Sequence, residues 1–320
     1  MFDLIGDIHG YADPLKRLLT TLGYTDNGIC WVHPSRKVIF LGDFVDRGPE
    51  QLATVAIVKN MVENGAALAV MGNHEFNAIA YATPHPSQPG EYLRPHTPKN
   101  TKQHLAFLNA VNEDSEIHRE IIDWFKSLPI YLELEGLRVI HACWDRKSLE
   151  ILQPFLEDDN SFMGSAWLEV TTKGTDAFEA AETLLKGLEI PLPAGIDFHD
   201  KDGIARSNIR TRWWETQELT YRDLAIVPSD IIEQLPHEPI EQDLLPNYDG
   251  EKPLFLGHYW LTGRPKPASD HIAILDYSIA AEHATSSASA GKLCAYRWCG
   301  ESILTEDNFA WVEGSRGQPT

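Results

Sequence analysis

Five places in the chain put carboxylate, amide or imidazole side chains directly after a short apolar stretch that is typical of a β-strand. They are Asp7 and His9 after residues 2–5, Asp43 and Asp46 after 37–41, Asn73 and His74 after 67–71, His141 after 137–140, and His258 after 254–256. Ligand sites of α/β proteins gather at the carboxyl ends of sheet strands, so we expect these side chains to converge. Together they predict a site for metal ions and phosphate.

The first of these segments, Gly6-Asp7-Ile8-His9-Gly10, combines an oxygen and a nitrogen ligand. In an extended backbone residues i and i+2 project to the same side, so Asp7 and His9 can converge on one ion. The flanking glycines allow a tight turn and a close backbone approach. A carboxylate with an imidazole suits Mn, Fe or Zn better than Mg or Ca, which favour sites made of oxygen alone.

The second segment, residues 41–49, carries two carboxylates and a guanidinium on one tight turn. Asp43 is the first side chain past the strand, and Asp46 with Arg47 follows one turn later. The two carboxylates therefore cannot point in one direction, and we expect them to have separate roles. The alternative is a solvated surface turn in which Asp46 pairs with Arg47, and this segment alone does not decide between the two.

The third segment, Gly72-Asn73-His74-Glu75, follows a third apolar strand and begins a helix. Asn73 and His74 are adjacent, so if one side chain points at the metals the other must diverge. The amide oxygen of Asn73 is the better candidate ligand. His74 would then face the substrate, where a group that exchanges a proton near neutral pH is useful. Glu75 is placed to satisfy the first amides of the helix.

Composition limits the classes of function. A length of 320 residues suits one large domain or two small ones with a substantial core, and we expect a single domain, 1–320, with a net charge of −20. Binding to a nucleic-acid backbone depends mainly on Lys and Arg at phosphates, so this charge argues against stable nucleic-acid binding. The four cysteines show no C-x-x-C spacing, which favours a reducing cytoplasm. No apolar run approaches the ~20 residues of a membrane span, and we expect no membrane partner.

Two segments leave alternatives open. Residues 82–104 are rich in Pro, His and Thr and predict a long ordered loop over the site or a mobile lid, with His85, His96 and His104 solvated rather than bound to metal. Residues 143–253 separate His141 from the next candidate ligand and predict a cap inserted into the core. The cap contains Arg206, Arg210, Arg212, Trp213 and Trp214. These side chains could clamp a phosphate, with Arg212 as our substrate-binding candidate, and stack a base. Alternatively, both tryptophans belong to the core and the arginines form rim salt bridges.

Taken together and in this order, the five segments resemble the calcineurin-like metallophosphoesterase superfamily and, within it, the phosphoprotein-phosphatase branch. The match covers residues 6–258, and 143–253 lies outside it. The resemblance implies an α/β (α+β) fold in four layers, with two mixed β-sheets flanked by helices and an inserted cap. It also implies metal-dependent hydrolysis of phosphate esters or anhydrides.

The resemblance also implies roles for individual residues. Asp7, His9 and Asp43 would hold a first divalent ion, and Asp43, Asn73, His141 and His258 a second. We expect manganese, with Fe, Zn, Ni or Co as alternatives. Such a pair of ions activates water for in-line attack on phosphorus. His74 would protonate the leaving oxygen, and Asp46 would orient His74. Arg47 and Asn73 would contact the phosphoryl group.

Departures from the pattern bear on the substrate. Trp260 stands where many relatives have a second histidine, and Asp46 and Glu75 differ from the bacterial symmetrical diadenosine tetraphosphatases. Met71 and Ala142-Cys143 differ from the eukaryotic Ser/Thr phosphatases. We therefore favour a hydrolase of small phosphoesters or nucleotide anhydrides, similar to diadenosine tetraphosphatases. A phosphoprotein phosphatase is the alternative, and a non-catalytic module that retains metals is a third hypothesis.

Overall fold

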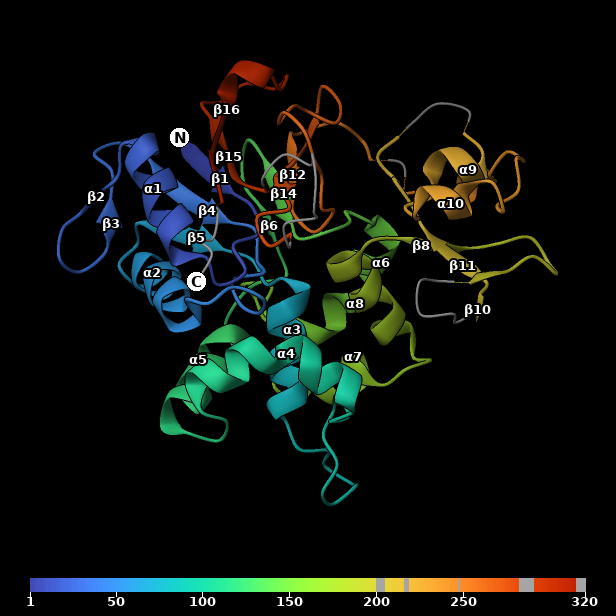
Figure 1. Ribbon diagram of the computed structural model, residues 1–320, viewed down its shortest axis with the longest axis horizontal. Helices are drawn as coiled ribbons and strands as arrows, with labels where there is room; N and C mark the ends of the chain where they lie inside the picture. The colour runs from blue at the N-terminus through green and yellow to red at the C-terminus, as the bar shows by residue number, and fades with distance from the viewer. Residues whose placement is uncertain (200–204, 216–218, 247, 282–290, 315–320) are drawn as a thin grey trace.

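A six-stranded mixed β-sheet forms one half of the centre of the molecule (Figure 1), in a computed structural model that describes residues 1–199, 205–215, 219–246, 248–281 and 291–314. Its strands run in the order β14 (Asp276–Tyr277), β15 (Lys292–Trp298), β1 (Phe2–Ile5), β4 (Lys37–Phe40) and β5 (Ala67–Ala69), and β16 (Phe309–Glu313) also pairs with β15. β1, β4 and β5 are parallel, whereas β15 is antiparallel to β1. The three parallel strands end at one edge, where the first three ligand segments begin.

A second mixed sheet supplies the remaining ligand segments. Its order is β13 (Ile272–Ile274), β12 (Leu254–Leu256), β7 (Arg138–Ile140) and β6 (Tyr131–Glu133). β12 is parallel to both β7 and β13, and β6 is the antiparallel partner of β7. His141 and His258 therefore leave neighbouring parallel strands at the same end.

Successive side chains of each strand pack alternately against the other sheet and against the helices. Leu4 and Ile39 are fully buried in one apolar cluster with Phe255 of the other sheet. Ile5 and Phe40, one position further along, belong to a second cluster on the opposite face. Successive strand residues point to opposite faces, so each strand contributes to both clusters. Burial of each such side chain stabilises the folded state by about 1.5–3 kcal/mol.

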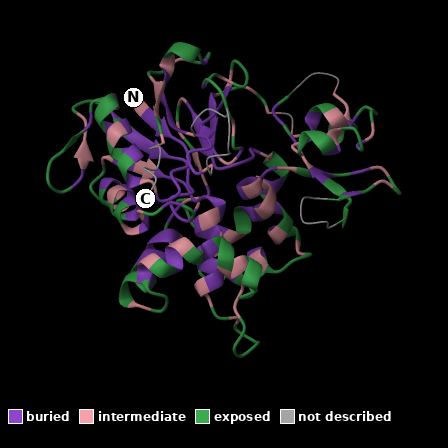
Figure 2. Cartoon of the chain, viewed as in Figure 1, coloured by how far each residue is buried: buried purple, intermediate pink, exposed green. Residues whose placement is uncertain are grey.

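Helices cover the outer faces of both sheets. α1 (Ala12–Leu22) and α2 (Gln51–Glu63) share a buried cluster with the outer face of the six-stranded sheet. Leu152 of α6 (Arg146–Leu152) and Leu184 of α8 (Asp176–Lys186) are buried in the cluster that contains Leu256 of the second sheet. Figure 2 shows buried residues concentrated along the strands and on the inner sides of the helices. The predicted α/β sandwich of two mixed sheets flanked by helices is confirmed.

The predicted loop 82–104 is shorter than expected, and this part of the prediction was wrong. α3 (Asn73–Ala82) is followed by α4 (Pro98–Val111) and α5 (Glu116–Lys126), with α7 (Trp167–Thr171) further along the chain. α4 begins at Pro98, and the Thr97 hydroxyl accepts a hydrogen bond from the Asn100 amide. Proline at the first helical position and threonine as N-cap together define a helix start. His104 therefore lies on a helix, and it is buried.

The later part of residues 143–253 has a small apolar core of its own. Buried side chains there include Ile190, Ile209 and Leu224. Its elements are β8 (Glu189–Pro191), β9 (Phe198–His199), β10 (Ala205–Arg206), β11 (Asn208–Arg210), α9 (Tyr221–Leu224), α10 (Ser229–Ile232) and the 3-10 turn Gln242–Leu244. In Figure 1 this region, drawn in yellow and orange, lies beside the sandwich. The limits 143–253 of an inserted cap stay a prediction.

Smaller elements complete the described chain. They are the strands β2 (Thr25–Asp26) and β3 (Trp31–Val32) and the 3-10 turns Gln153–Phe155 and Glu306–Asn308. Among the described residues, every helix is too short or too polar to cross a membrane.

Candidate metal centre and substrate cavity

Tight turns after β1 and β4 bring Asp7, His9 and Asp43 together. His9 and Asp43 have positive φ values of 50° and 53°, and the Ile8 and His9 amides both donate to the Asp43 carbonyl. His9 Nε2 lies 3.7 Å from Asp43 Oδ2 and 4.0 Å from Asp7 Oδ2. Non-glycine residues at positive φ are uncommon and cluster at functional sites, where the surrounding structure holds them. The geometry supports the convergence that the sequence predicts.

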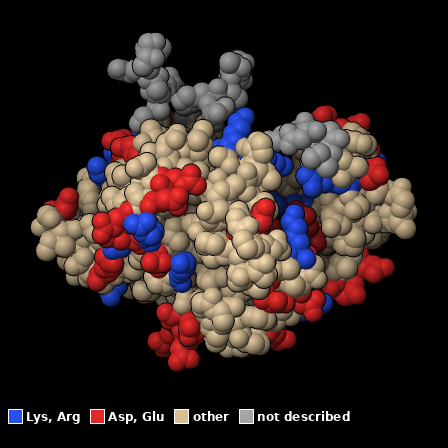
Figure 3. All heavy atoms as spheres, turned by 90° about the horizontal axis from the view of Figure 1, so that it is seen from below, with Lys and Arg blue, Asp and Glu red and all other residues tan. Residues whose placement is uncertain are grey.

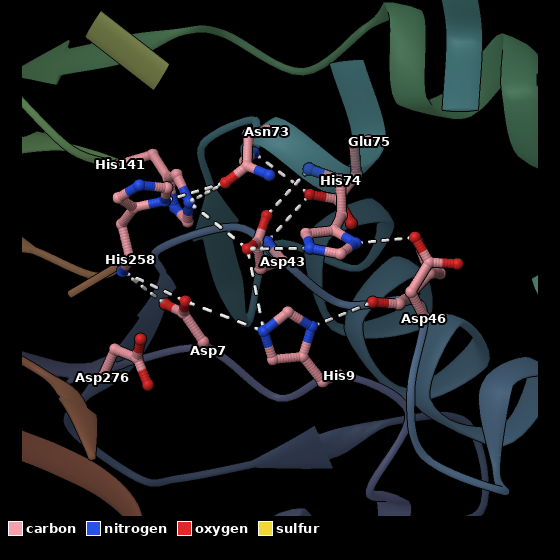
Figure 4. Close-up of polar contacts among 12 residues, drawn as sticks. Asp7, His9, Asp43, Asp46, Asn73, His74, Glu75, His141, His258 and Asp276 are labelled. Carbon is pink, nitrogen blue, oxygen red and sulfur yellow. Dashed lines mark hydrogen bonds and ion pairs between the residues drawn. The ribbon is translucent and has the colours of Figure 1, made fainter. Parts of the chain in front are cut away.

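The second group of candidate ligands meets on the other side of Asp43 (Figure 4). Asn73 Oδ1 lies 2.9 Å from His258 Nδ1 and 3.1 Å from His141 Nε2, and His141 Nε2 lies 3.4 Å from Asp43 Oδ2. The Asp43 carboxylate is thus shared by both groups of side chains.

Backbone carbonyls fix the ring nitrogens of two of these histidines. His9 Nδ1 donates to the Val45 carbonyl at 3.1 Å, and His141 Nδ1 donates to the Leu41 carbonyl at 2.7 Å. A carbonyl only accepts, so Nδ1 carries the proton in both rings. The Nε2 lone pair of each ring therefore faces the carboxylates, the orientation that metal-binding histidines show.

These residues fit divalent metal ions. His9 Nε2 is buried and has no hydrogen-bond partner among the described residues. Burial, together with neighbouring His74, lowers the pKa of His9 to about 3, so the ring is neutral. Burial and the nearby Asp276 raise the pKa of Asp7. A buried carboxylate anion, or a buried imidazole nitrogen without a hydrogen-bond partner, destabilises the folded state unless a cation binds to it. The potential ligand atoms of Asp43, His141 and His258 lie within 4.8 Å of one another, as do those of His9, Asp43 and His74.

Glu75 supports the centre from behind. Its carboxylate accepts the amides of Asp43 and Phe44, each at 2.8 Å, and the amide of Gly72 at 3.1 Å. Burial and the neighbouring Asp43 raise the pKa of Glu75 to about 7. The sequence predicts that Glu75 satisfies amides at the start of its own helix. The structure shows that Glu75 also accepts the amides of Asp43 and Phe44, and so holds the turn that carries Asp43.

Asp46 and His74 form a pair beside the ligand groups, in which Asp46 is buried and His74 is half-buried. His74 Nδ1 lies 2.6 Å from Asp46 Oδ2, and His74 Nε2 lies 3.9 Å from Asp43 Oδ2. Burial would raise the pKa of Asp46, but His104 and His74 hold it well below its usual value. Asp46 is therefore an anion between two imidazoles.

His104, for which the sequence predicts a solvated loop position, is that second imidazole. Its Nδ1 lies 2.8 Å from Asp46 Oδ1, and its Nε2 is buried without a described partner. The helix start at Thr97-Pro98 was the signal in the sequence that would have placed this histidine on an ordered, packed element. His85 and His96 do not reach the ligands. The ring of His96 stacks between Tyr81 and Tyr92, at 3.7 and 4.0 Å.

The structure separates the other predicted substrate contacts. Arg47 is exposed, and its guanidinium lies over the Trp260 ring, 4.2 Å from the centroid, rather than against Asp46. Arg212 does not line the cavity, because its guanidinium bonds to the Asp223 carbonyl at 3.4 Å. Arg210 lines it instead, with Nη1 3.5 Å from His258 Nε2.

A large cavity opens in front of the metal centre. Its volume is about 1580 Å³. Its basic lining residues are Arg47, Arg94, Lys99, Lys102, Lys173, Lys186 and Arg210, and its acidic ones are Asp43, Asp46 and Glu182. Acidic side chains are spread widely over the face shown in Figure 3, so a cavity dominated by cations contrasts with the net charge of −20. The lining predicts an anionic ligand.

Residues 1–170 match the sequence model of the calcineurin-like phosphoesterase family. The chain belongs to this family. The relationship predicted from the motifs is therefore confirmed, and with it the class of metallophosphoesterases.

Curated relatives are named as dinucleoside tetraphosphatases. An asymmetrical bis(5'-nucleosyl)-tetraphosphatase of Halalkalibacterium halodurans is 36% identical over 148 residues, which cover 44% of this chain and 56% of that protein. A symmetrical one from a Marinomonas species is 30% identical over 163 residues, 48% of this chain and 50% of that protein. The chain thus spans about half the length of the curated relatives it matches.

Solved structures are more distant. A Saccharomyces cerevisiae serine/threonine phosphatase has a TM-score of 0.47 at 13% identity, covering 99% of this chain and 81% of that one. A cold-active protein tyrosine phosphatase mutant has a TM-score of 0.49 at 13% identity, covering 92% and 74%. Both likenesses are too distant to bear on function.

Proposed function

We propose that this protein is a two-metal phosphohydrolase whose substrates are nucleotide phosphoanhydrides of the dinucleoside polyphosphate type. The observation that carries the proposal is the buried donor set on Asp43, which opens into a cavity of about 1580 Å³ with seven basic lining residues. The names of the curated relatives point in the same direction.

Six residues would hold two divalent ions. Asp7, His9 and Asp43 would bind the first, and Asp43, Asn73, His141 and His258 the second. Mixed carboxylate and imidazole ligands favour manganese, with Fe, Zn, Ni or Co as alternatives. When bound, such ions lower the pKa of the attacking water and offset the charge of the phosphoryl oxygens.

His74 would be the general acid for the leaving oxygen. Its Nδ1–H is fixed on Asp46, so Nε2 faces the cavity. Burial opposes a charge on this ring, but Asp43 and Asp46 outweigh it and raise the pKa of His74, which favours the protonated form. His104 would act as a positioning residue, because it holds the second oxygen of Asp46 and limits rotation of that carboxylate.

Basic side chains would bind the phosphates. Arg47 and Asn73 remain candidate phosphoryl contacts, and Arg210, which lines the cavity, replaces Arg212 as the third. The guanidinium of Arg94 bonds only to neutral oxygens of Asn77, Asn100 and Gln103, among the described residues. No described carboxylate neutralises it by direct contact, so its charge remains available to an anion in the cavity.

The compartment belongs to the same proposal. Cys30, Cys143 and Cys294 are buried free thiols and Cys299 is an exposed one. Free thiols fit the reducing environment of the cytoplasm.

Product analysis with manganese-loaded protein tests the function. Diadenosine tetraphosphate and a phosphoserine peptide are offered at equal concentration, with Asp43→Asn as the blank. The proposal expects faster conversion of the dinucleotide and loss of both reactions in the blank. Preference for the peptide would replace the proposal by the alternative, a phosphoprotein phosphatase. Product formation that persists in the blank would exclude this centre as its source.

A further inference from the structure

Trp260 places an exposed indole on the wall of the cavity. The residue is 37% exposed and lines the cavity next to the metal centre. Trp213 and Trp214, the tryptophans that the sequence offers for base stacking, are 2% and 7% exposed and belong to the core. A large apolar side chain left exposed beside a ligand site is a candidate contact surface.

The backbone holds this indole in an unusual conformation. Trp260 has a φ of 51°, which is rare for a bulky residue. Its amide donates to Asp276 Oδ2 at 2.7 Å, and Asp276 is itself 2% exposed. The strained conformation is therefore held by a buried carboxylate. Strain of this kind persists where the surrounding structure requires one particular side-chain position.

The surroundings of the ring connect it to the reaction centre. The Arg47 guanidinium lies 4.2 Å from the ring centroid, and the His9 ring lies 6.2 Å away at an interplanar angle of 50°. One contact is thus with a candidate phosphate-binding cation and the other with a candidate metal ligand. The indole therefore lies on the cavity wall beside the candidate centre, where it can contact another part of a substrate whose phosphate is bound there.

We propose that Trp260 is a stacking platform for a nucleobase of the substrate. The inference rests on the proposed function, because it assigns the base-binding subsite of the same nucleotide. Every base has a π-face, so an indole binds bases with little dependence on their identity. The cations around the cavity bind the phosphates, and the indole supplies the flat apolar contact that the phosphates lack.

A comparison of two substrates tests the platform. Wild type, Trp260→Leu and Trp260→Phe are loaded with manganese, and kcat/KM is measured for diadenosine tetraphosphate and for inorganic tetraphosphate, which has no base. Loss of the indole also removes the ring under Arg47, so kcat/KM should fall for both substrates. The readout is therefore the ratio of kcat/KM for diadenosine tetraphosphate to kcat/KM for inorganic tetraphosphate. Trp260→Leu should lose roughly 5- to 150-fold more on the dinucleotide, the range of base–aromatic stacking. Trp260→Phe should recover most of this ratio.

A matched control is Trp311→Leu. Trp311 is partly buried on β16 and does not line the cavity, so its substitution should leave the ratio at the wild-type value. Equal losses on both substrates in Trp260→Leu would overturn the inference and leave the indole as a support for Arg47 alone.

The proposed function fails in a different way. Wild-type protein that cleaves inorganic tetraphosphate but no nucleotide would contradict the function itself. Wild-type protein that cleaves both, with an unchanged ratio in Trp260→Leu, would contradict only the platform.

Discussion

The floor and the rim of the cavity are built differently. The floor consists of the six candidate ligands, which come from strand ends of both sheets; all except His258 are buried. The rim consists of Arg47, Arg94 and Trp260, which come from loops and are exposed or half-buried. The floor is thus fixed by backbone geometry at strand ends, whereas the rim presents loop side chains with surface exposed to a ligand. We infer that the floor performs phosphoryl chemistry and the rim selects the substrate.

Close packing explains why the floor has so little freedom. A Cβ added at Gly257 would overlap the Asp7 carboxylate, and one added at Gly72 would overlap the Asp43 backbone and side chain. These glycines let separate strand ends approach within contact distance. No comparable restraint acts on the exposed Arg47 side chain.

Loss of the proposed general acid, His74, should lower turnover more than the changes at Glu75, His104 and His118 considered below. His74→Asn should lower turnover by ~10²- to 10⁴-fold, the usual range for general acid–base catalysis. Steady-state kinetics at saturating substrate measures this effect, and metal analysis of the same sample serves as the control. Unchanged turnover with metals still bound would remove His74 from the role.

The support behind the floor should affect metal affinity. Glu75→Gln leaves one acceptor oxygen for amides that two oxygens now hold, so the Asp43 turn loosens. We expect manganese affinity to fall by about 10- to 100-fold, as for other residues that orient metal ligands. Manganese titration followed by calorimetry gives the value. Equal affinity in wild type and variant would show that the turn holds Asp43 without Glu75.

The contribution of His104 should be smaller and should depend on Asp46. His104→Leu removes a hydrogen bond to a charged group, worth about 1.5 kcal/mol or more, so turnover should fall about 10-fold or more. His104→Asn keeps a donor near the Nδ1 position and should recover part of the loss. In an Asp46→Asn background the same substitution should have little effect. Equal losses in both backgrounds would mean that His104 only stabilises the fold.

The smallest expected effect concerns stability behind the floor. His118 is buried, and burial, with His104 nearby, lowers its pKa below 6.5. The unfolded chain therefore binds a proton first as pH falls, and stability decreases from about pH 6.5 toward the lower folded pKa. His118→Asn, which keeps an acceptor for the Asp114 amide, should flatten this decrease between pH 7 and 5. Urea unfolding at several pH values measures it, and parallel curves for the two proteins would contradict the assignment.

The positions of the floor residues at strand ends could be predicted from the sequence because each ligand segment follows an apolar run, which is a local property of the sequence, and their roles as metal ligands stay a prediction. Asp7 and His9 converge through a tight turn with His9 at a φ of 50°, not through the extended backbone that the two-residue period assumes. The rim depends on contacts between distant segments. Arg210 lines the cavity and Arg212 does not, although they are two residues apart. The burial of Trp213 depends on its contacts with the Ala142 carbonyl and Tyr259. His104 was misplaced because the composition of 82–104 outweighed the cap at Thr97.

Metal stoichiometry tests the central claim most directly. Protein stripped with a chelator, dialysed against manganese and analysed by elemental mass spectrometry should hold two ions per chain. Asp43→Asn, which removes the carboxylate shared by both ligand groups, should retain neither ion tightly. A wild-type chain that binds one ion or none, or an Asp43→Asn chain that still holds two, would contradict the account of the floor.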